Sequence, residues 1–135
     1  MFQGCTSLVT LPSALATPHP QYSNQSYRNM FEGCTAITAI PSGMLDFDDL
    51  TPSSCVEMFS GCTGLKTVPS INVSGTVSGS ACVNMFKNCT ALTSVTAINA
   101  KDVLVSGFNS MFYNCSSLVI PPSLDQITGF SNNCM

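Results

Sequence analysis

The stretch MFEGCTAITAIP, Met30 to Pro41, recurs through the chain and decides its fold. Close copies begin at four other methionines: MFQGCTSLVTLP at Met1, MFSGCTGLKTVP at Met58, MFKNCTALTSVT at Met85 and MFYNCSSLVIPP at Met111. The Met-Phe pairs at 1, 30, 58, 85 and 111 are separated by 29, 28, 27 and 26 residues. A period in this range predicts that each repeat stacks on its sequence neighbours along one axis.

Each repeat carries apolar side chains at helical spacing around its Met-Phe pair. In the second copy Tyr27, Met30, Phe31 and Cys34 stand at i, i+3, i+4 and i+7, which is one face of about two helical turns. The residue before the repeat cysteine is Gly or Asn in every copy, and both types accept the left-handed conformation that closes a helix. The pattern therefore predicts a short helix in each repeat, with this structural core: Met30, Phe31, Cys34, Met58, Phe59, Cys62, Met85, Phe86, Cys89, Met111, Phe112 and Cys115.

A short apolar run follows each repeat cysteine, as in Ile37 to Ile40, and a proline closes the run in several copies. Proline cannot donate to a strand ladder, so we expect a short strand that ends at this point. Successive strands are expected to pair in parallel on one face of an α/β solenoid, with the helices on the other face. The segment INVSGTVSGSAC, residues 71–82, reads as a flexible insert.

The chain of 135 residues is long enough for one domain, and we interpret 1–135 as a single solenoid of about five repeats. The repeats start near residues 1, 27, 55, 82 and 108, and residues 129–135 form a degenerate end. Because Met1 occupies the methionine position of the repeat, we interpret the chain as a fragment of a longer repeat protein. Its export signal would then lie elsewhere.

The chain has eight cysteines, and five of them occupy the repeat position. Cysteine is small and often fully buried, so we expect these five to pack as free thiols. Cys55 and Cys82 hold the same offset in adjacent repeats, and stacking would bring their Cα atoms to about 5 Å, within disulfide range. A Cys55–Cys82 disulfide therefore stays an alternative. Cysteines seven residues apart do not have zinc-site spacing, so we expect no metal and no cofactor.

Charge is scarce in this sequence: charged residues make up 8% of the chain, and the net charge is −3 with four Lys and Arg residues. No basic face is available for nucleic acid, and no apolar run reaches the roughly eighteen residues of a membrane span. The only histidine, His19, lies between prolines, and we find no catalytic set, so we expect no enzyme. The acidic cluster Asp46, Asp48 and Asp49 lacks the spacing of a calcium loop.

The pattern C-x-x-M-F-x-[GN]-C-[TS]-x-L, fullest from Cys55 to Leu65, resembles the BspA-like group of leucine-rich repeats. The resemblance covers essentially the whole chain. It implies a right-handed leucine-rich-repeat solenoid, and it implies an extracellular location on the surface of a bacterium, with adhesion by protein binding. Related repeats also resemble segments of phage particle proteins, so a phage particle is the alternative location.

We therefore expect a non-enzymatic, surface-exposed binding or adhesion module that contacts an unknown protein or glycan through the solenoid face and its loops. On the leucine-rich-repeat register, the outward strand residues are Thr10, Pro12, Ala39, Pro41, Thr67, Pro69, Ser94 and Thr96. This row is small and neutral and lacks the Tyr, Trp and Arg anchors that dominate interface energies. The alternative is a structural spacer, filament or phage/virion-decoration segment that self-associates through the open solenoid ends.

Overall fold

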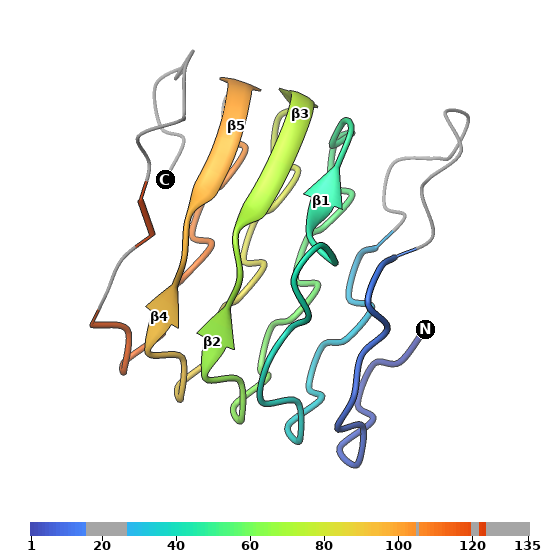
Figure 1. Cartoon of the computed structure of the whole chain (residues 1–135), viewed down its shortest axis with the longest axis vertical. Coiled ribbons are helices and arrows are strands. Elements are labelled where there is room, and N and C mark those ends of the chain that lie inside the picture. The colour runs from blue at the N-terminus through green and yellow to red at the C-terminus, as the bar shows by residue number, and fades with distance from the viewer. Residues whose placement is uncertain (16–26, 105, 120–121, 124–135) are drawn as a thin grey trace.

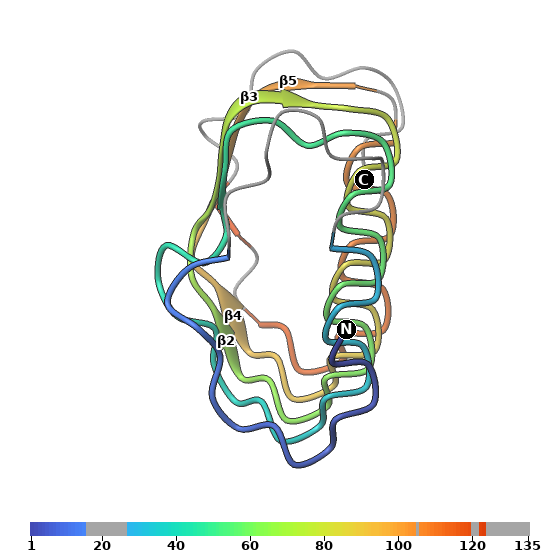
Figure 2. The same cartoon turned by 90° about the vertical axis from the view of Figure 1, so that its right-hand side faces the viewer.

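The computed structural model describes residues 1–15, 27–104, 106–119 and 122–123, and these residues form successive coils stacked side by side (Figure 1). Viewed at right angles to Figure 1, each coil runs as a loop around a common interior, with one wall of tight turns facing two strand-bearing sides (Figure 2). The stacking places corresponding residues of neighbouring repeats next to one another. It is the framework on which every feature below depends.

The predicted α/β class, a right-handed leucine-rich-repeat solenoid with helices on one face, is wrong. The described residues contain no helix and only five short strands. The segment expected to be helical is instead a run of β-turns, in which the N–H of Met30 donates to Tyr27 O at 3.2 Å and the N–H of Cys34 donates to Phe31 O at 3.1 Å. These bonds span three residues, as in a β-turn, rather than the four of an α-helix.

The segment does not form a helix because every second N–H in it donates a hydrogen bond to a carbonyl group of the neighbouring coil. Asn29 donates to Val56 O at 3.0 Å, Phe31 to Met58 O at 2.9 Å and Gly33 to Ser60 O at 2.8 Å. An α-helix satisfies its N–H groups within its own segment, whereas here half of them bond the next coil. We name this run of stacked turns the turn wall; it comprises residues 1–5, 27–34, 52–62, 79–89 and 106–115.

Left-handed residues recur every fourth position of the turn wall. In the third coil they are Ser53, Glu57 and Gly61, with φ of 62°, 56° and 72°. The Gly and Asn residues before each cysteine are therefore left-handed, as predicted, but as members of a repeating series rather than as single helix ends. A four-residue turn period brings residues i and i+4 to the same side, which is why the apolar spacing mimicked a helix.

The strands are parallel and pair coil to coil. Strands β1 (Asp46–Phe47), β3 (Ile71–Val77) and β5 (Ile98–Val103) form one sheet in the order β1-β3-β5, and β2 (Thr67–Val68) pairs with β4 (Ser94–Val95) in a second. The second sheet lies in the apolar run after the repeat cysteine, where strands were predicted. The longer strand β3 occupies the segment expected to be a flexible insert, so that expectation is wrong.

The core is a set of side-chain ladders that run the length of the stack. Five phenylalanines of the turn wall stack nearly face to face, with ring centroids 5.6 Å apart for Phe2–Phe31, 5.2 Å for Phe31–Phe59, 5.5 Å for Phe59–Phe86 and 5.6 Å for Phe86–Phe112. The predicted core residues are buried except Met30 and Phe112, which are half-buried. No helix able to cross a membrane occurs among the described residues.

Replacing Gly61 with Val should destabilise the stack, whereas replacing it with Asn should not. An added Cβ at Gly61 comes no closer than 3.7 Å to another atom, so the cost lies in the backbone φ of 72° rather than in a steric clash. Asn88 and Asn114 occupy the equivalent position with φ of 62° and 59°. We expect a loss of about 2 kcal/mol for Gly61→Val and much less for Gly61→Asn, measured by thermal unfolding. Equal melting temperatures for the two variants would contradict the left-handed assignment.

Candidate functional site

The repeat cysteines donate hydrogen bonds between coils. The thiol of Cys34 lies 3.0 Å from Phe2 O, that of Cys62 3.1 Å from Phe31 O, that of Cys89 3.2 Å from Phe59 O and that of Cys115 3.1 Å from Phe86 O. Each of these carbonyls also accepts the backbone N–H of the cysteine in its own coil. The thiol is therefore a small apolar side chain that also donates a hydrogen bond between stacked coils, a combination that alanine and valine lack.

The buried thiols are poor nucleophiles in this environment. Burial raises the pKa of the Cys62 thiol to about 12, and the neighbouring Cys34 thiol makes a smaller contribution in the same direction. Burial also raises the pKa of Cys89. Reactive cysteines need a lowered pKa and access to solvent, and these thiols have neither. Cys62 and Cys89 are therefore suited to packing and to hydrogen bonding between coils rather than to nucleophilic attack.

Cys55 and Cys82 are both free thiols in the structure, and both are completely buried. A hydrogen bond with Cys55, followed by burial, raises the pKa of Cys82 well above its ordinary value. The two cysteines therefore stack as neighbours, as their shared offset predicted, without the disulfide that was the alternative. Cys134 and His19 lie outside the described residues.

Polar side chains also form columns across the coils. Asn72 donates to Asp46 at 2.5 Å, Asn99 donates to Asn72 at 2.7 Å, and the N–H of Thr76 donates to Asp49 Oδ1 at 2.7 Å. Two members of the acidic cluster thus accept hydrogen bonds from the neighbouring coil. Within the described part of the chain, no three His, Cys, Asp or Glu residues gather closely enough to hold a metal ion.

The predicted outward residues line up in two columns. Ala39 bridges to Thr67, which pairs with Ser94, and Pro41, Pro69 and Thr96 follow two positions later in each coil. Five of the eight are exposed, namely Thr10, Pro12, Ala39, Thr67 and Thr96, and the other three are half-buried. The structure thus brings these residues to one side of the stack as an uncharged surface.

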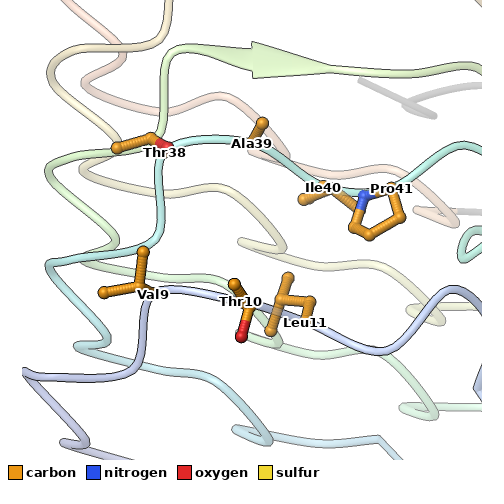
Figure 3. Close-up of a pocket in the computed structure, with 7 residues that line it drawn as sticks. All are labelled: Val9, Thr10, Leu11, Thr38, Ala39, Ile40 and Pro41. Carbon is orange, nitrogen blue, oxygen red and sulfur yellow. The ribbon is translucent and has the colours of Figure 1, made fainter.

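A shallow groove of about 330 Å³ opens between the first and second coils on this surface (Figure 3). It is lined by residues 9–11 and 38–41, so it includes Thr10, Ala39 and Pro41 of the predicted row. Its other lining residues were not predicted, because the repeat pattern treats all coils as equivalently paired. The incomplete first copy was the only sequence signal that its packing could differ.

The groove lies where a backbone ladder stops. The N–H of Val119 donates to Thr93 O at 3.3 Å, that of Thr93 to Lys66 O at 2.9 Å, and that of Lys66 to Thr38 O at 2.9 Å. The equivalent bond from Thr38 N–H to Val9 O is not formed, and among the described residues neither group has another hydrogen-bond partner. One backbone donor and one backbone acceptor, on the two coils that line the groove, are therefore left without a partner among the described residues.

Comparison of the chain with protein-family models, with curated proteins and with solved structures found no match.

Raising the pH should destabilise the stack, because the buried side chains of Cys62 and Tyr27 lose their protons more readily in the unfolded chain. The pKa of Cys62 rises from 9.0 to about 12 on folding, and that of Tyr27 rises from 10.0 to about 12, because burial disfavours both anions. The unfolded state therefore loses these protons first, so the stabilisation is complete below about pH 9 and is lost progressively as the pH approaches 12. We expect the melting temperature to fall between pH 9 and pH 11, and to fall less in Cys62→Ala. A constant melting temperature in the wild-type chain would contradict this.

Proposed function

We propose that this chain is a non-enzymatic binding module that takes an extended, uncharged segment of a partner protein in the groove between its first two coils. The observation that carries the proposal is the broken ladder at Thr38 and Val9. Adding a strand to an incompletely paired edge is a common mode of peptide recognition, in which the main chain supplies affinity and side-chain pockets supply specificity. A peptide backbone offers both the acceptor that Thr38 N–H lacks and the donor that Val9 O lacks.

The lining of the groove supports a peptide rather than a glycan. Its side chains come from Val, Thr, Leu, Ala, Ile and Pro, so it offers no aromatic ring for a sugar to stack on and no charge. Small apolar or β-branched side chains fit such a surface. The absence of Trp, Tyr and Arg from the lining favours weak binding, which repeated display of the module would strengthen by avidity.

The charge-poor, hydroxyl-rich composition supports an exported setting for this activity, on the surface of a bacterium or on a phage particle. A second candidate is a structural role, as a spacer, filament or decoration segment that self-associates. That candidate is favoured by the backbone groups left open at the two ends of the stack.

Selection of random peptides on the immobilised chain tests the binding function. We expect uncharged peptides rich in β-branched residues, whose affinity falls about tenfold in Ala39→Lys, because a long charged side chain fills the groove. Thr63→Lys is the matched control, since Thr63 is exposed on the same stack but does not line the groove. The proposal would be refuted if peptides bound the wild type, Ala39→Lys and Thr63→Lys equally. It would also be refuted if the chain bound arrayed glycans and no peptide.

A further inference from the structure

The two ends of the turn wall carry complementary backbone groups. Within the wall, N–H groups of one coil donate to carbonyls of the next, as Phe2 does to Met30 O at 2.9 Å and Asn88 to Tyr113 O at 2.9 Å. At the fifth coil, the equivalent N–H groups of Phe112 and Asn114 have no hydrogen-bond partner among the described residues. At the first coil, the equivalent carbonyls of Met1 and Gln3 have none either.

The side-chain ladders are also open at the first coil. Phe2 stacks on Phe31 through one face of its ring and is 40% exposed. Cys5 is exposed, whereas each later repeat cysteine of the wall donates its thiol to the phenylalanine carbonyl of the preceding coil. At the fifth coil, Phe112 stacks on Phe86, and within the described part of the chain its carbonyl accepts a single hydrogen bond, from the N–H of Cys115.

The described residues of the two end coils, 1–15 and 106–119, include no charged side chain. The seven acidic and four basic residues of the chain all lie outside residues 1–15 and 106–119. Natural proteins commonly protect an open strand edge by placing lysine or another charge there, because unpaired edges recruit further chains. Both described ends of this stack lack that protection.

We propose that copies of this chain join head to tail, with the first coil of one copy stacked on the fifth coil of another in the register of the repeats. The N–H groups of Phe112 and Asn114 then donate to Met1 O and Gln3 O of the next copy. Its Phe2 stacks on Phe112, and its Cys5 thiol donates to Phe112 O. The inference deepens the second candidate function and rests on it.

The polarity of the backbone bonds excludes a two-fold symmetric pair at this surface. Two first coils would bring acceptors against acceptors, and two fifth coils would bring donors against donors. Only the head-to-tail arrangement pairs the two sets. Because such a contact leaves a free end on each copy, it generates open chains rather than closed dimers.

Sedimentation of the intact chain tests whether it assembles. We expect the average mass to rise with protein concentration beyond that of a dimer, and Phe2→Asp to remain a monomer, because a buried carboxylate interrupts the phenylalanine ladder. Thr67→Asp is the matched control: it places the same charge at the exposed Thr67 of β2, away from both ends, and should assemble as the wild type does. A wild-type chain that remains monomeric, or that stops at a dimer, would overturn the proposal.

Disulfide trapping tests the register without relying on a disruptive variant. Gln3 and Tyr113 are exposed and occupy equivalent positions, which the proposed contact brings to about 5 Å between Cα atoms. We expect a mixture of Gln3→Cys and Tyr113→Cys chains, with Cys5 and Cys134 replaced by Ser, to oxidise mainly to the 3–113 heterodimer. Predominant 3–3 or 113–113 homodimers would overturn the head-to-tail geometry.

The two proposals fail independently in these experiments. Ala39→Lys changes the groove and leaves both end coils' ladders intact, so it should abolish peptide binding while the chain still assembles. Phe2→Asp should abolish assembly while the monomer still binds peptide. Loss of both properties in Phe2→Asp would place peptide binding at the assembled ends and would overturn the groove proposal, while the 3–113 disulfide still tests the head-to-tail contact.

Discussion

The structure depends on one set of interactions, the hydrogen bonds that join the turn wall of each coil to the next. In the first four coils, every second N–H of the wall is bonded to the next coil, as from Phe59 to Met85 O at 2.9 Å and from Gly61 to Lys87 O at 2.7 Å. This geometry excludes a helix, imposes left-handed residues at every fourth position and brings identical side chains into register. The phenylalanine stack, the cysteine donors and the asparagine columns are consequences of that register.

The repeat period was sufficient to predict stacking, parallel pairing and most of the buried residues, since identical phrases about 27 residues apart have equivalent environments. The helices were predicted wrongly for a specific reason. A turn period of four residues and a helix period of 3.6 both bring residues four apart to the same side, as for Tyr27 and Phe31 or for Met30 and Cys34. Ser53, Glu57 and Ser80 have φ above 50°, which is incompatible with a helix. Their residue types do not predict this left-handed conformation. Only the neighbouring coil imposes it.

The candidate site was predicted in part. The exposed row containing Ala39 and Thr67 follows from alternation along a strand, because every second residue faces outward. The groove could not be predicted in this way, because it arises where the first coil departs from the pairing of the others. The open ends are a similar case: they follow from the polarity of the wall bonds, which the sequence alone does not reveal. Binding and self-association thus use the places where the repeating ladders stop.

The central claim is that the Met-Phe segments are left-handed turn runs bonded between coils. The most direct measurement is the NMR backbone chemical shifts of residues 52–62, which report the sign of φ at each position. The account predicts left-handed shifts at Ser53, Glu57 and Gly61, separated by residues with negative φ. A continuous set of helical shifts across this segment would contradict it.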